Sequence, residues 1–120
     1  MNIQIMNQYG ISFNKKVNGV IETGSNSIEL TNYLYLYSRY KPSLEEFISA
    51  IDLALNGQFD SIDEDDKVWS QELGYDMYIG TILDESTFEL YLADHYEETV
   101  KIYPLIDVRE IFNSLLEFIQ

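Results

Sequence analysis

The stretch from residue 77 to residue 93 limits the fold of this chain more than any other. It consists of two segments, MYIGTIL (77–83) and TFELYLA (87–93), joined by the short polar sequence DES. Aromatic and β-branched residues with period-two alternation are typical of β-strands. Two such strands with a short polar connection predict an antiparallel hairpin, so the fold must include a sheet with one face towards a core.

Two further segments carry apolar residues at helical spacing. In the first, Ser43 and Glu46 form a capping box, and the dipeptide NG at 56–57 ends the apolar stripe. In the second, Asp107 is the expected N-cap of a stripe that continues to Ile119. Both segments therefore predict amphipathic helices that pack on the sheet.

Shorter patterns predict the remaining elements. Short strands are expected at residues 3–7, 10–14, 19–23 and 98–105, and a short helix at residues 66–73. Residues 28–37 alternate again and predict a strand, whose polar face consists of Glu29, Thr31, Tyr33, Tyr35 and Tyr37. The chain is long enough for one core. Together these elements predict one α+β domain, residues 1–120, in which a mainly antiparallel sheet has two to three helices packed on one face, in a single layer of each.

Acidic residues are concentrated in one third of the chain. The whole sequence has 21 Asp and Glu against 7 Lys and Arg, a formal net charge of −14. Residues 60–98 contain 13 of these acids and one base, Lys67, a net charge of −12. Such a surface repels nucleic acid and anionic lipid and attracts cations or a basic protein. Direct binding to nucleic acid or to a membrane is therefore not expected.

The densest part of this segment is FDSIDEDDKVW (59–69), which has five carboxylates in seven positions. As an EF-hand loop that begins at Asp63, it has Lys67 where an oxygen ligand is needed and Val68 where Gly is needed. No metal site is therefore predicted, although a weak, irregular calcium site stays open as an alternative. Some of the carboxylates can instead stabilise the first turn of a helix through Val68 and Trp69.

Few features of the chain suit nucleophilic catalysis, and carboxylate pairs are too abundant to indicate a glycoside hydrolase. Cysteine is absent, and the single histidine, His95, lies in ADHYEE, where a surface turn is expected. Neither GxGxxG nor GxxxxGK[ST] occurs, so no phosphate-binding loop is predicted. We therefore predict neither an enzyme nor a bound cofactor.

The N-terminal sequence MNIQIMNQYG has neither the basic nor the apolar region of a signal peptide. No apolar run approaches the roughly 18 residues that a membrane helix needs. The absence of cysteine suits a reducing compartment. From these features we expect a cytoplasmic location.

Tyrosines alternate with carboxylates on the predicted polar faces of the strands. Rigid aromatic area beside charge is typical of protein-binding surfaces, although ordinary strand composition also explains it. The row of Tyr33, Tyr35 and Tyr37 has the same character. Phe59 and Trp69 flank the five carboxylates of residues 60–66, which we call the acidic run, as candidate anchors. The predicted partner-binding residues are Asp60, Asp63, Glu64, Asp65, Asp66, Trp69, Glu72, Asp76, Asp84, Glu85, Glu89 and Tyr91.

About half of the chain resembles the small acidic immunity proteins of bacterial toxin–immunity systems, particularly those of contact-dependent growth inhibition. The resemblance lies in DSIDEDDKVW, GTILDESTFELYLADHYEE and IYPLIDVREIF, and it is one of overall style without a diagnostic motif. It implies a cytoplasmic protein that binds and neutralises the C-terminal domain of a cognate toxin, often a basic nuclease. No functional residue can be carried over from it.

An inhibitor of the phage type that mimics nucleic acid is the alternative function. It would use the same carboxylates, placed like phosphates, against a DNA-binding protein. The sequence alone separates these two functions poorly.

Overall fold

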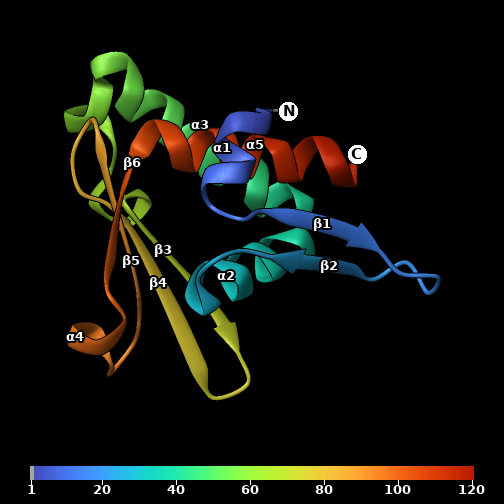
Figure 1. Cartoon of the computed structure of the whole chain (residues 1–120). Coiled ribbons are helices and arrows are strands. Elements are labelled where there is room, and N and C mark those ends of the chain that lie inside the picture. The colour runs from blue at the N-terminus through green and yellow to red at the C-terminus, as the bar shows by residue number, and fades with distance from the viewer. Residues whose placement is uncertain (1) are drawn as a thin grey trace.

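The computed structural model describes residues 2–120 and has an α+β fold, as predicted (Figure 1). Its helices and strands follow in chain order as α1 (Ile3–Gln8), β1 (Ser12–Lys15), β2 (Ile21–Gly24), α2 (Ile28–Ser38), α3 (Lys41–Leu53), β3 (Val68–Leu73), β4 (Asp76–Ile82), β5 (Thr87–Leu92), α4 (Tyr96–Thr99), β6 (Lys101–Pro104) and α5 (Leu105–Ile119). Three short helical turns connect α3 to β3, namely η1 (Ala54–Gln58), η2 (Phe59–Ser61) and η3 (Glu64–Asp66).

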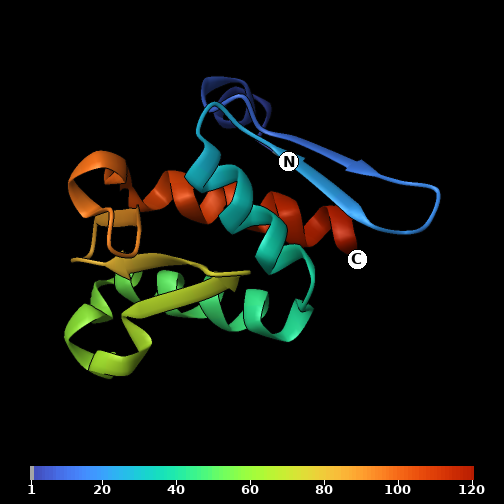
Figure 2. The same ribbon diagram turned by 90° about the horizontal axis from the view of Figure 1, so that it is seen from below.

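The described strands form two antiparallel sheets where the sequence predicts one. Strands β3, β4, β5 and β6 form a four-stranded sheet in that order, and β1 pairs with β2 as a hairpin. Helices α2 and α5 lie between the sheet and the hairpin, and α3 packs beside α5 (Figure 2). The long helices therefore cover one face of the four-stranded sheet, which we call its inner face.

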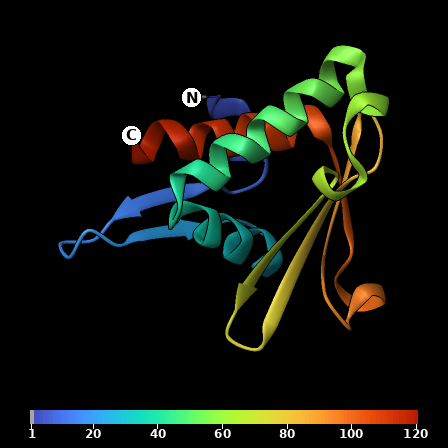
Figure 3. The same cartoon turned by 180° about the vertical axis from the view of Figure 1, so that it is seen from behind.

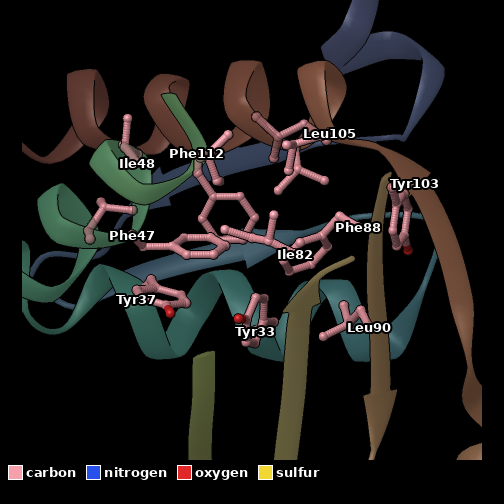
Figure 4. Packing of buried hydrophobic residues seen from close by; sticks show 14 of the residues in the cluster. Tyr33, Tyr37, Phe47, Ile48, Ile82, Phe88, Leu90, Tyr103, Leu105 and Phe112 are labelled. Carbon is pink, nitrogen blue, oxygen red and sulfur yellow. The ribbon is translucent and has the colours of Figure 1, made fainter. Parts of the chain in front are cut away.

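An aromatic cluster holds the helices on this inner face (Figure 4). Its five rings are fully buried and come from α2, α3, β5 and α5, and they belong to Tyr33, Tyr37, Phe47, Phe88 and Phe112. The rings of Tyr37 and Phe47 stack with 4.8 Å between centroids, and Phe112 meets Phe47 edge-on at 5.1 Å. Such pairs add to the free energy gained from burial. The cluster therefore ties all three long helices to the sheet.

Residues 28–37 form the helix α2, so the predicted strand is wrong. The Ser27 side chain caps this helix, because its Oγ accepts a hydrogen bond from the Leu30 N–H at 3.3 Å. Leu30, Tyr33 and Tyr37 are buried at helical spacing. Since α2 lies between the sheet and the hairpin, its other side is also partly apolar. Apolar residues on two sides of a helix imitate the alternation of a strand.

Residues 68–73 form the strand β3, so the short helix predicted for residues 66–73 is also wrong. β3 pairs with β4 along its whole length, from Val68 opposite Thr81 to Leu73 opposite Asp76. Gly74 follows with φ +62°, a left-handed conformation that turns the chain into β4. Pairing with β4 therefore overrides the weak local helical pattern.

The N-terminal elements are predicted only in part. Residues 3–7 lie in the helix α1 in place of a strand, and the Asn2 side chain caps it by accepting a hydrogen bond from the Ile5 N–H at 3.1 Å. The strands predicted near residues 10–14 and 19–23 are confirmed as β1 and β2. The strand predicted at residues 98–105 is shorter, because α4 occupies its beginning and α5 begins at Leu105.

Both predicted amphipathic helices are present, but their first turns differ from the prediction. α3 begins before Ser43, which lies inside the helix, and so the capping box does not form. In α5, Asp107 lies in the first turn and accepts a hydrogen bond from the Tyr9 hydroxyl. Burial and this hydrogen bond raise the pKa of Tyr9 well above its usual value. None of the helices within residues 2–120 is both long enough and apolar enough to cross a membrane.

Candidate functional site

A cleft of about 450 Å³ lies between α3 and the segment 61–69. Figure 3 shows the two segments themselves: α3 runs in front of α5, and the chain folds back beneath the end of α3 before it enters β3. Its carboxylates are Glu45, Glu46, Asp63 and Asp66. Its apolar lining consists of Ala50, Leu53, Ile62 and Trp69. We call this site the acidic cleft.

Trp69 is held rigidly in the wall of the acidic cleft. Its indole N–H donates a hydrogen bond to the Asp66 carbonyl oxygen at 2.7 Å, and its own carbonyl oxygen accepts one from the Tyr33 hydroxyl at 2.7 Å. On the core side, its ring centroid lies 5.4 Å from that of Phe47. The ring therefore offers a fixed, half-buried aromatic surface to an occupant of the cleft.

In the described part of the chain, the carboxylates of the acidic cleft are not paired with a base. Lys67, the one base of residues 60–98, has its Nζ 2.7 Å from Glu64 Oε1 and 4.3 Å from the centre of the Phe59 ring. Its side chain is only 12% exposed, so this lysine is committed to those two partners. Within residues 2–120, none of the four carboxylates of the cleft forms an ion pair. The negative field of the cleft is therefore uncompensated.

A second cleft, of about 310 Å³, lies on the other side of the acidic run, where Phe59 and Asp60 meet Asp84 and Glu85. The Asp84 carboxylate accepts a hydrogen bond from the Ser86 backbone N–H at 2.9 Å. This hydrogen bond lowers the pKa of Asp84 below its usual value, which keeps the carboxylate charged.

The fold brings together most of the residues predicted to bind a partner. One end of the molecule carries the whole acidic run and the turn between β4 and β5, and with them Asp60, Asp63, Glu64, Asp65, Asp66, Trp69, Asp84 and Glu85. Glu72, Glu89 and Tyr91 lie apart from this end, on the face of the sheet opposite the helices. Asp76 is exposed at the start of β4, next to the turn between β3 and β4.

Two carboxylates of the acidic cleft, Glu45 and Glu46, were outside the predicted set. They are exposed on α3, where the sequence indicates an ordinary solvated helix face. What makes them part of a site is the return of residues 61–69 along α3, a contact between distant segments. No local pattern in the sequence signals that contact.

The predicted tyrosine row is not a binding surface. Tyr33 and Tyr37 are fully buried, and only Tyr35 is partly exposed, with its ring centroid 5.9 Å from the Arg39 guanidinium. Burial raises the pKa of Tyr37 to about 12. The error follows from the wrong assignment of residues 28–37, because a helix buries Tyr33 and Tyr37 on the same side.

The acidic run forms neither the first turn of a helix nor a calcium-binding loop, the two local structures considered from the sequence. It does not begin a helix through Val68 and Trp69, because both residues lie in β3. Two single turns, η2 and η3, hold it instead, with the Asp66 N–H bonded to the Asp63 carbonyl oxygen at 2.9 Å. Among the residues described, no group of three or more acidic or histidine side chains is placed to hold a metal ion. His95 is exposed beside α4, where a surface turn is expected.

The chain matches no protein-family profile, no curated protein and no solved structure. Its function is therefore inferred from the geometry and charge of the acidic cleft. A cleft with an apolar lining, a fixed aromatic ring and four unpaired carboxylates suits a long cationic side chain, which has an apolar stem and a charged end.

Proposed function

We propose that the protein binds a basic partner protein through the acidic cleft and acts as an immunity protein that neutralises a toxin domain in the cytoplasm. The single observation that carries the proposal is the position of Trp69, which lies fixed among four carboxylates that form no ion pair within residues 2–120. The resemblance of the sequence to immunity proteins supplies the biological role.

A lysine or arginine of the partner would enter the acidic cleft with its aliphatic stem along Leu53 and Trp69. Its cationic group would reach Glu45, Glu46, Asp63 or Asp66. A cation over an aromatic ring contributes about 0.5–2 kcal/mol, depending on how far it is desolvated. Because Trp69 is already held by hydrogen bonds, little conformational entropy is lost when the partner binds.

The charge around the cleft suits rapid capture of the toxin. Complementary charge raises association rates to about 10⁸–10⁹ M⁻¹s⁻¹ at low salt. A nuclease has a basic groove for phosphates, and carboxylates can occupy it. The acidic cleft presents four carboxylates for this purpose.

The test compares two variants that lose the same charge. In the cleft variant, the substitutions are Glu45→Gln, Glu46→Gln, Asp63→Asn and Asp66→Asn. In the control variant, the substitutions are Glu22→Gln, Asp94→Asn, Glu97→Gln and Glu98→Gln. Each protein is used to capture the proteins encoded beside its gene, and affinity for the captured protein is then measured.

We expect a basic protein to bind the wild type and the control variant, and to bind the cleft variant at least about tenfold more weakly. Expression of the captured protein alone should be toxic, and co-expression of the wild type should relieve the toxicity. Equal binding by the cleft and control variants would overturn the proposal. If the captured protein binds DNA without being toxic, and DNA competes for it, the protein is a nucleic-acid mimic instead.

A further inference from the structure

The outer face of the four-stranded sheet, opposite the long helices, is left without a covering layer. Figures 1 and 3 show α2, α3 and α5 on one side of the sheet, and the other side bordered only by the single turn α4. From α4, Tyr96 packs on Tyr91 with 4.8 Å between ring centroids, and its hydroxyl donates a hydrogen bond to Glu89 at 3.2 Å. The middle of the face remains open.

This outer face carries more apolar side chains than is usual for a sheet face that is exposed to solvent. The register places Val68 beside Thr81, Thr81 beside Glu89, and Glu89 beside Ile102 on β6. Val68 is 46% exposed and Ile102 is 57% exposed. The outward residues that are apolar or aromatic are Val68, Met77, Ile79, Tyr91 and Ile102. Ile79 on β4 and Tyr91 on β5 are direct neighbours, and apolar side chains gathered on one open sheet face mark interaction surfaces.

The charge on the outer face selects the kind of partner. Glu72 and Glu89 are its ionisable acids, and none of the outward strand positions carries a base. In a symmetric pair of two copies, Glu89 would lie within a surface that carries only carboxylates, and each chain has a net charge of −14. A second copy is therefore disfavoured, whereas a partner with apolar and cationic side chains is complementary.

The outer face is continuous with the acidic cleft through a single strand. In β3, Trp69 lines the acidic cleft, and its neighbours Val68 and Ser70 point to the outer face. β3 is an edge strand, with β4 as its one neighbour in the sheet. A partner that reaches around this edge contacts both surfaces.

We propose that the basic partner of the acidic cleft also covers the outer face of the sheet, with apolar side chains on Ile79, Tyr91 and Ile102 and cationic side chains at Glu72 and Glu89. This inference rests on the proposed function. It adds that the partner must present apolar residues together with its basic ones, because charge alone would leave the outer face uncovered.

The experiment uses two short peptides without tryptophan. One alternates arginine with valine, and the other alternates arginine with serine. Trp69 fluorescence reports occupancy of the acidic cleft, because it is the single tryptophan of the chain. Backbone amide chemical shifts of the wild type report contacts on the outer face. Binding is compared among the wild type, Ile79→Thr, Ile102→Thr and Val17→Thr, the last at a fully exposed position in the turn between β1 and β2.

We expect the arginine–valine peptide to bind the wild type at least about fivefold more tightly than the arginine–serine peptide. Ile79→Thr and Ile102→Thr should remove most of this difference, and Val17→Thr should not. Amide shift changes at Ser70, Ile79, Tyr91 and Ile102 should accompany binding in the wild type, which makes the result independent of how the variants fold.

Equal affinity for the two peptides, with shift changes confined to the acidic cleft, would overturn this inference and leave the proposed function standing. Shift changes on the outer face with no response of Trp69 would overturn the acidic cleft as a site, and with it the partner contact proposed here. Association of two copies through the outer face would also overturn the inference.

Discussion

The two faces of the four-stranded sheet are built from the same strands and serve different ends. The inner face carries Tyr78, Gly80 and Phe88, all buried against helices, whereas the outer face carries Ile79 and Glu89, which none of the long helices covers. Alternation along a strand separates the two sets completely. The difference teaches that stability depends on the inner face, while the outer face and the acidic cleft beside it are accessible from solvent.

Truncation of one aromatic ring on each side of the sheet gives the largest contrast. Phe112→Ala removes a fully buried ring from the aromatic cluster and should lower the free energy of unfolding by about 3–5 kcal/mol. Tyr91→Ala, on the outer face, should cost no more than about 1 kcal/mol. Urea unfolding measures both. Similar losses for the two variants would show that the outer face is part of the core.

Gly80 provides a sharper test, because it lies where the inner face is most tightly packed. A Cβ at this position would collide with the Tyr33 hydroxyl and the Phe88 ring. Gly80→Ala should therefore destabilise the protein by about 1–3 kcal/mol, through displacement of both rings. The adjacent outward variant Thr81→Ala serves as the control and should cost less than about 1 kcal/mol. A neutral Gly80→Ala in urea unfolding would contradict the packing described.

The outcome of the sequence predictions follows the same division. The strands of residues 77–93 and the two amphipathic helices were predictable, because each buries one face and so shows one period. The helix α2 was not predictable, because it is covered on two sides and its apolar residues do not follow a single helical period. The strand β3 was not predictable either, because it depends on pairing with β4, which its own sequence pattern does not show.

Some residues of the candidate site could be predicted from the sequence and others could not. The acidic run and Trp69 were visible as a local concentration of charge beside an aromatic residue. Glu45 and Glu46 were invisible, because only the return of the chain along α3 places them beside Trp69. The predicted role of Tyr33 and Tyr37 was lost together with the strand that was assigned to them.

Alkaline pH should destabilise the buried side of the sheet through Tyr33 and Tyr37. Burial raises the pKa of Tyr37 to about 12 and also raises that of Tyr33 well above its usual value, whereas tyrosine in an unfolded chain ionises near about 10. The stabilisation from these neutral side chains is complete below about pH 10 and is lost as the pH rises through the folded pKa. Urea unfolding over this range should show a smaller loss for Tyr37→Phe than for the wild type, by about 1–2 kcal/mol at the alkaline end. Equal losses would mean that Tyr37 ionises freely.

The smallest effect is expected at the ion pair of the acidic run. Glu64 is 89% exposed and pairs with Lys67 at 2.7 Å. Glu64→Gln should change the free energy of unfolding by less than about 0.5 kcal/mol, because exposed ion pairs contribute little and are screened by salt. Thermal melting of this variant beside the wild type measures the change. A large loss would show that the acidic run is a structural element and not a binding surface.

The central claim, that the acidic cleft accepts a cationic side chain beside Trp69, is tested most directly by the fluorescence of that tryptophan. The wild type and the variant that neutralises Glu45, Glu46, Asp63 and Asp66 are titrated with the arginine–serine peptide at low and at high salt. A saturable change in the wild type, weaker at high salt and absent from the variant, is the predicted result. An unchanged fluorescence in the wild type, or the same change in both proteins, would contradict the claim.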